Sequence, residues 1–142
     1  MLGILFSIIA GAAMSFQGVF NTRLSEDIGL WESNAFIQGT AFALSLIAML
    51  FMAKGNWHAL TETPKIYLFG GVIGLVITVT VMLGIKNLSP TVAISTILIA
   101  QLLVAAAIDA FGWFGQEQVV FGWPKYAGTG LMIAGVLLFK FK

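Results

Sequence analysis

Five long apolar stretches, joined by short connections, most constrain what this chain can fold into. They cover roughly residues 2–20, 33–52, 64–85, 90–111 and 124–139. A helix needs about 20 apolar residues to cross a bilayer core about 30 Å thick, and these stretches are close to that length. Charged residues make up only 9% of the 142 positions, whereas about a quarter is usual in a soluble domain. The sequence therefore predicts a single transmembrane domain and excludes soluble enzyme folds.

The continuity of the stretches selects helices over a barrel. Barrel strands alternate apolar and polar residues over about ten positions, and only helices and closed barrels satisfy the backbone in lipid. Pro64, Pro90 and Pro124 stand where three of the helices should begin, a place where the missing N–H costs little. Thr63 and Ser89 precede two of them and are predicted N-caps. We expect an all-α integral membrane protein with five transmembrane helices.

Composition also narrows the chemistry. The sequence has no cysteine and one histidine, which excludes thiolate chemistry and argues against a transition-metal centre. The net charge of +1 gives no sign of nucleic-acid binding. An intramembrane enzyme would need a nucleophile with a base, or paired acids, at one depth, and Asp109 is the one acid inside a predicted span. We expect no enzyme activity and no cofactor.

Basic residues are divided almost evenly between the two sides of the membrane. With five spans, Lys54, Lys65 and Lys125 lie on the amino-terminal side, and the other side holds Arg23, Lys86, Lys140 and Lys142. Orientation follows the Lys/Arg bias between sides, and three against four is almost no bias. Three explanations are open: both orientations are made and pair antiparallel, one orientation is weakly fixed with the carboxyl terminus inside, or a partner chain decides.

A few polar side chains lie inside the spans and are the candidate substrate contacts. Gln17 and Asn21 are four residues apart, as are Asn34 and Gln38, so each pair shares one face of its helix. Gln101 lies near the middle of the fourth span. Amides in lipid face other helices or water-filled cavities, so these residues either line a substrate path or join the first two helices. We favour the path for Gln17 and Gln101.

Aromatic and acidic residues complete this candidate site. Phe16, Phe20 and Phe36 would provide apolar or cation-binding walls. Asp109 lies near the carboxyl end of the fourth helix, where the helix dipole disfavours a negative charge. We expect Asp109 to gate the path or to form an ion pair with a lysine on its side of the membrane; the alternative is a solvated acid at the interface.

Small residues recur at helical spacing in three spans, and they let helix backbones approach closely in lipid. The predicted packing positions are Gly11, Ser15, Gly70, Gly74 and Gly128. We expect most of them to pack within the chain and at least one to form a seam with another chain.

Two segments, MSFQGVFNTRLSEDIGLWESNAFIQGTAFAL and LSPTVAISTILIAQLLVAAAIDAFGWFG, resemble the five-helix YdcZ-like family of the drug/metabolite transporter superfamily. The residues that carry the resemblance are Gln17, Asn21, Phe36, Gly39, Gln101, Asp109, Phe111 and Gly112. The family usually has Gly-Gln where this chain has Ala100-Gln101, a mild departure because alanine is also small. With the spacing of the spans, the resemblance covers nearly the whole chain.

The resemblance implies an assembly as well as a fold. Members occur as single five-helix proteins, as oppositely oriented pairs and as fused ten-helix proteins, which implies that two inverted copies make one transporter in a bacterial inner membrane. Together with the balance of basic residues, it predicts an antiparallel homodimer of dual topology, or pairing with an oppositely oriented paralogue.

The expected function is that of a small secondary transporter subunit, moving a small metabolite or drug-like molecule by alternating access. Inverted symmetry suits this mechanism because it gives inward-open and outward-open states of similar energy. The competing hypotheses are a non-transporting membrane protein, such as an assembly or regulatory subunit of a larger complex, and a passive channel. Substrate flux into liposomes that hold this chain alone would discriminate them.

Overall fold

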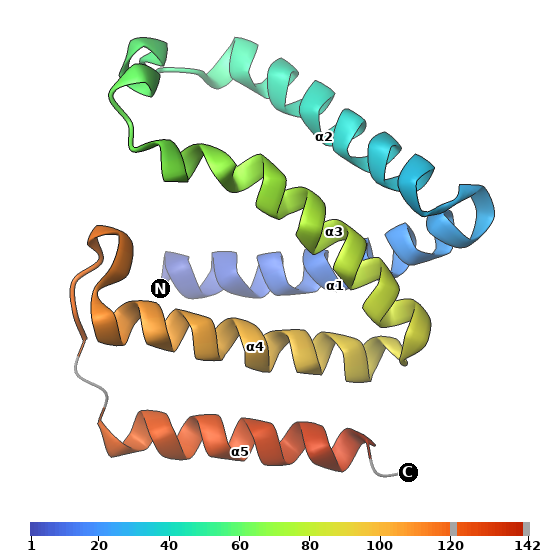
Figure 1. Ribbon diagram of the computed structural model, residues 1–142, viewed down its shortest axis with the longest axis vertical. Coiled ribbons are helices and arrows are strands. Elements are labelled where there is room, and N and C mark those ends of the chain that lie inside the picture. Colours follow the sequence, from blue (N-terminus) through green and yellow to red (C-terminus); the bar gives the residue numbers. More distant parts are fainter. Residues whose placement is uncertain (120–121, 141–142) are drawn as a thin grey trace. The chain divides into compact units, whose positions relative to one another are not determined.

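The computed structural model describes the backbone of residues 1–119 and 122–140, and in this part the chain is helical. Five α-helices follow one another along the chain (Figure 1): α1 (Leu2–Ile28), α2 (Leu30–Met52), α3 (Gly70–Asn87), α4 (Pro90–Phe111) and α5 (Trp123–Lys140). Three short 3₁₀ helices lie in the connections: η1 (Trp57–Thr61), η2 (Lys65–Phe69) and η3 (Trp113–Gly115). The all-helical prediction is confirmed for these residues. Lys142 lies outside them.

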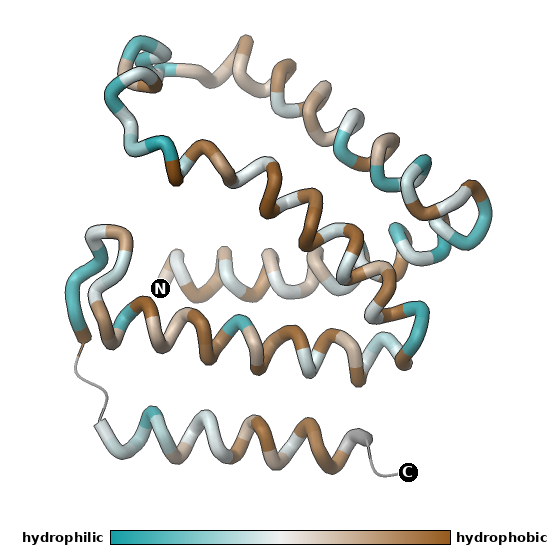
Figure 2. Tube along the Cα trace, viewed as in Figure 1, coloured by the Kyte–Doolittle hydropathy of each residue, from teal (hydrophilic) through white to brown (hydrophobic). Residues whose placement is uncertain are grey.

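Four helical segments of the described part are long and apolar enough to cross a membrane. They are Leu2–Ile28, Leu30–Met52, Lys65–Asn87, which joins η2 to α3, and Pro90–Phe111. The helix α5 is present but does not meet the same criterion of length and hydropathy, because its first half is polar or weakly apolar, as the pale and teal tube of Figure 2 shows. The multi-pass membrane architecture therefore stands on four segments, and α5 accompanies them.

Predicted helix boundaries differ from the structure in the first half of the chain: α2 begins at Leu30 rather than at residue 33, and α3 begins at Gly70, after η2, rather than at residue 64. The first span was expected to end at residue 20, but α1 continues to Ile28, because Arg23, Leu24 and Glu26 have good helix propensity and Arg23 pairs with Glu26 at 3.0 Å. Gly29 then has φ 103°, a conformation that glycine adopts at little cost. A single residue thus separates α1 from α2.

The predicted caps differ in outcome. Ser89 is the N-cap of α4, since its Oγ accepts a hydrogen bond from the Val92 N–H at 3.4 Å and Pro90 is the first helical residue. The prediction for Thr63 is wrong. Its hydroxyl donates to the carbonyl of Ala59 at 2.9 Å, because the preceding residues form the 3₁₀ helix η1 and leave that carbonyl within reach.

The chain divides into two compact units, Met1–Lys86 and Asn87–Lys142. In the first unit, α1 packs against α2, and α3 contacts α1 at Gly18 and α2 at Ser33 and Gln38. In the second unit, α4 and α5 lie side by side (Figure 1), with η3 against the end of α4.

A close helix contact of the first unit is at Gly18, which is buried. A Cβ added at Gly18 would lie 2.9 Å from Cδ1 of Ile85 and 3.3 Å from Cγ1 of Val81. Met82 of α3 is 1% exposed. The absence of a side chain at Gly18 is therefore what lets α3 approach α1.

Candidate functional site

Buried polar residues gather where α1, α2 and α3 meet. We call Thr22, Ser25, Ser33 and Asn34 the polar junction; each is at most 7% exposed. On α1, the Thr22 hydroxyl donates to the carbonyl of Gly18 at 2.7 Å, and the Ser25 hydroxyl donates to the carbonyl of Thr22 at 2.7 Å. These bonds stay within one helix, so the two hydroxyls are satisfied without a ligand.

Ser33 connects α2 to α3. Its hydroxyl lies 3.1 Å from the carbonyl of Leu30 and 3.6 Å from Sδ of Met82. Since Ser33 is 0% exposed and Met82 is 1% exposed, this contact is part of the packing rather than a site that a ligand could enter.

Asn34 is the exception in the polar junction. Its side chain is 4% exposed, and its Oδ1 has no hydrogen-bond partner among the described residues. A buried acceptor without a donor costs about 1–3 kcal/mol. Asn34 and Gln38 were predicted to share one face of the second helix. In the structure the side chain of Gln38 has a hydrogen-bond partner, whereas Oδ1 of Asn34 has none among the described residues.

Gln38 bonds across to α3. Its Nε2 donates to Oγ1 of Thr78 at 3.3 Å, and the Thr78 hydroxyl donates in turn to the carbonyl of Gly74 at 2.8 Å. This geometry is that of a link between helices, but it joins α2 to α3 rather than the first two helices.

The remaining candidates of the first unit face outward. Gln17 is exposed and Asn21 is half-buried. Phe16 and Phe20 are 66% and 68% exposed, with ring centroids 6.2 Å apart, and Phe36 of α2 is 61% exposed. Because these rings and amides lie on exposed or half-buried faces of the unit Met1–Lys86, a path built from them needs further walls.

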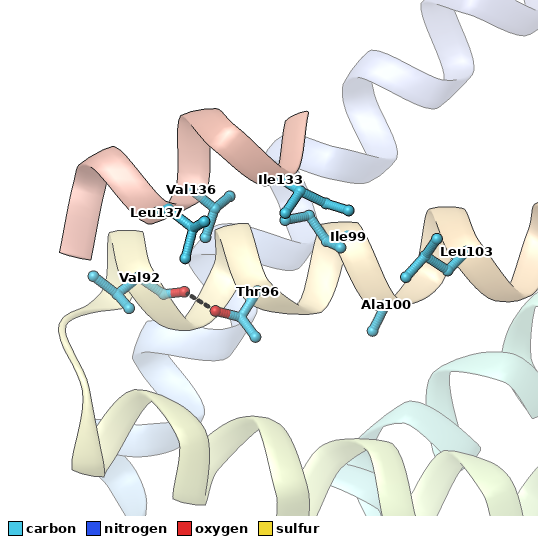
Figure 3. A pocket seen from close by; sticks show the side chains of 8 residues that line it. All are labelled: Val92, Thr96, Ile99, Ala100, Leu103, Ile133, Val136 and Leu137. Atoms are coloured by element: carbon cyan, nitrogen blue, oxygen red, sulfur yellow. Dashed lines mark hydrogen bonds between the residues drawn. The ribbon is translucent and has the colours of Figure 1, made fainter. Parts of the chain in front are cut away.

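Two grooves lie between α4 and α5 in the second unit. The first, shown in Figure 3, measures about 360 Å³. It is lined by Val92, Thr96, Ile99 and Leu103 of α4 and by Ile133 and Leu137 of α5, among others. The Thr96 hydroxyl donates to the carbonyl of Val92 at 2.8 Å, so even this polar group is satisfied inside the helix. We call it the apolar groove.

The second groove holds charges of both signs. It measures about 460 Å³, and its lining includes Asp109 of α4 and Lys125 of α5 together with Leu102, Ala106, Gly128 and Met132. Asp109 is half-buried and Lys125 is exposed. We call it the charged groove. The groove places Asp109 and Lys125 in one lining; the predicted ion pair of Asp109 with a lysine and its role as a gate both stay predictions.

The connection after α4 caps the last turn of the helix, which contains Asp109. Gly112 is left-handed, with φ 64°, and its N–H bonds to the carbonyl of Ile108. The Nε2 of Gln118 donates to the carbonyl of Ala110 at 2.8 Å, and the N–H of Val119 donates to the carbonyl of Asp109 at 2.9 Å. The carbonyls of Ile108, Asp109 and Ala110 at the end of α4 are thereby satisfied. The capping role of Gln118 was not predicted, because a side chain that bonds to a helix carbonyl eight residues earlier leaves no local sequence pattern.

The remaining predicted residues are Gln101 and the helix-packing positions. Gln101 is exposed near the middle of α4. A Cβ added at Gly11, Gly70, Gly74 or Gly128 would meet no atom within 4 Å, and the Ser15 hydroxyl donates to the carbonyl of Gly11 at 3.0 Å. The role of these positions in helix packing stays a prediction, whereas Gly18, which was not among them, lies close to the side chains of Ile85 and Val81 on α3.

Fold and surface together define a polytopic α-helical membrane protein whose helices carry polar groups on outward faces. Residues 2–138 match the family model DMT_YdcZ, described as "Putative inner membrane exporter, YdcZ". The chain belongs to this family, which confirms the resemblance seen in its sequence and supports a transporter-like protein of an inner membrane. Comparison with curated proteins and with solved structures gave no match.

Proposed function

We propose that the chain is one half of a small secondary exporter, and that two copies pack antiparallel around a path near the bilayer midplane. The observation that carries the proposal is the exposure of Gln17 on α1 and of Gln101 at the middle of α4. An amide without a partner in hydrocarbon costs several kcal/mol. Such side chains therefore face another chain or a water-filled path, and membership of an exporter family favours the path.

The proposal includes a fifth transmembrane span. The apolar groove sets Ile133 and Leu137 beside the first half of α4, and the charged groove sets Lys125 and Met132 beside the second half. The helix α5 therefore runs antiparallel to α4 along most of its length, so it crosses the membrane if α4 does. With five spans the two termini lie on opposite sides, and the balance of basic residues gives no orienting bias.

In the proposed dimer, most of the candidate side chains contact the substrate and one links two helices. Gln17, Asn21 and Gln101 offer hydrogen bonds to a small metabolite or drug-like molecule, and Phe16 and Phe20 provide apolar walls. Gln38 stays bonded to α3 and holds α2 in place. Inverted copies related by a two-fold axis in the membrane plane give inward-open and outward-open states of similar energy, which is what alternating access requires.

Cysteine labelling in intact cells tests the dual topology, because the sequence has no native cysteine. Gly55→Cys and Leu88→Cys lie at the two ends of the segment Lys65–Asn87, so they sit on opposite sides of the membrane in any one orientation. Both positions are exposed. We expect a membrane-impermeant maleimide to label about half of each variant. Full labelling of one variant and protection of the other would refute the homodimer and point to an oppositely oriented partner chain.

Flux from proteoliposomes tests transport itself. Vesicles that hold the purified chain are loaded with a radiolabelled mixture of amino acids and nucleosides, or with the cation tetraphenylphosphonium. We expect saturable release of at least one of these probes, lost in Gln17→Ala and in Gln101→Ala. Gln116→Ala, in the exposed connection after α4, is the matched control. Equal flux in all three variants would show that Gln17 and Gln101 do not contact the substrate. No release of any probe would favour the non-transporting alternative.

A further inference from the structure

The charged groove differs from the apolar groove in one respect that points to a ligand. Both lie between α4 and α5 and both have apolar walls, but only the charged groove brings a carboxylate and an ammonium, those of Asp109 and Lys125, into the same lining. We propose that this groove binds a phospholipid with a primary-ammonium head, such as phosphatidylethanolamine.

The depth of the groove matches a lipid rather than a soluble molecule. Asp109 lies two residues before the end of α4, and Lys125 lies in the first turn of α5, so both charges are at the level of the lipid heads. Leu102 and Met132 line the same groove seven residues away along their helices, which is about 10 Å deeper at 1.5 Å per residue. The groove thus runs from the head region into the hydrocarbon.

Small residues make the room for an acyl chain. Ala105, Ala106 and Gly128 line the groove between its charged end and its deep end. A Cβ added at Gly128 would meet no atom within 4 Å, so the helix surface there is open. A soluble zwitterion would gain nothing from these apolar walls, whereas an acyl chain would contact them along their length.

The two charges select the head group. Lys125 attracts the phosphate, as basic residues near membrane surfaces do. Asp109 accepts hydrogen bonds from a primary ammonium, and charge-assisted bonds of this kind are stronger than neutral ones. A choline head has no N–H to donate, and a glycerol head has no cation. This assigns to Asp109 a contact with a lipid head in place of a gate.

Native mass spectrometry of the full chain in detergent tests the proposal. Phosphatidylethanolamine, phosphatidylcholine and phosphatidylglycerol with identical acyl chains are titrated separately, so the contribution of the chains cancels. We expect the ethanolamine lipid to bind about five- to tenfold more tightly, since roughly 1 to 1.4 kcal/mol of head-group selectivity corresponds to that ratio. Asp109→Asn should remove the preference for the ethanolamine lipid, and Lys125→Gln should weaken the binding of all three lipids.

Matched variants separate the groove from a general effect of charge. Glu117→Gln and Lys65→Gln make the same charge changes at exposed positions outside the groove and should leave the preference intact. Gly128→Leu fills the groove without changing a charge and should weaken the binding of all three lipids. This variant keeps the proposal testable if Asp109→Asn fails to fold.

Three results would overturn the proposal. These are an ethanolamine preference that survives in Asp109→Asn, a preference lost equally in Glu117→Gln, and competition by soluble phosphoethanolamine, which would make a free metabolite the occupant. The readout is lipid binding and does not involve transport. A negative result therefore leaves the proposed exporter function standing, and a failed flux assay leaves this proposal standing.

Discussion

Substituting Gly18 tests the helix contact on which the first unit depends. The added Cβ would lie 2.9 Å from Cδ1 of Ile85 and 3.3 Å from Cγ1 of Val81, whereas carbons in contact are about 3.5–4.0 Å apart. Alanine needs a shift of less than about 1 Å at the end of one flexible side chain. Leucine adds three more carbons in the same direction. Overpacking costs about 1–3 kcal/mol, so we expect Gly18→Leu to lower the free energy of unfolding by about 2 kcal/mol and Gly18→Ala by clearly less.

Unfolding by sodium dodecyl sulfate in mixed micelles, followed by far-ultraviolet circular dichroism and tryptophan fluorescence, measures this difference. Gly39→Leu is the matched control, since it makes the same change in α2 of the same unit, where an added Cβ meets no atom within 4 Å. Measurement at two protein concentrations separates a change in unfolding from a change in association. An equal loss in Gly39→Leu and Gly18→Leu would refute the reasoning, because the cost would then come from glycine replacement in general.

Three further predictions use the same preparations. Asn34→Leu removes a buried acceptor without a partner and should raise the free energy of unfolding by about 1 kcal/mol; lower stability would mean that Oδ1 has a partner in the membrane. Ser89→Ala should destabilise α4 by about 0.5–1 kcal/mol through loss of its cap, seen as faster hydrogen exchange at Val92, and unchanged exchange would contradict the cap. Gly55→Lys and Leu88→Lys should shift the orientation of the chain in opposite directions, read by labelling a cysteine added at the carboxyl terminus; no shift would disprove orientation by charge balance.

The fold class followed from the sequence because bilayer thickness imposes a length on each apolar stretch. The bounds of the fourth stretch, 90–111, agree with α4 (Pro90–Phe111), since Pro90 marks one end and Gly112 the other. The first stretch failed at its carboxyl end for a physical reason. Hydropathy reports where lipid ends, whereas a helix continues until a residue such as Gly29 breaks it.

The candidate site was less predictable, because its members meet across long separations in sequence. Gln38 stood out as a polar residue in a span, but its partner Thr78 is 40 residues away and no local pattern connects them. Asp109 stood out as the one acid in a span. Its neighbour Lys125 was one of several lysines on its side, and only the packing of α4 on α5 selects it.

The small-residue stripe of α1 extends beyond the positions that were predicted to pack. Counting in steps of four from Gly3 selects Gly11 and Ser15, but a helix has 3.6 residues per turn, so the stripe continues through Gly18 and Thr22. The later part is buried in the first unit, and the earlier part is exposed. In lipid, an exposed row of small residues favours close packing of another helix. We therefore expect the amino-terminal half of α1 to contribute to the seam of the proposed antiparallel dimer.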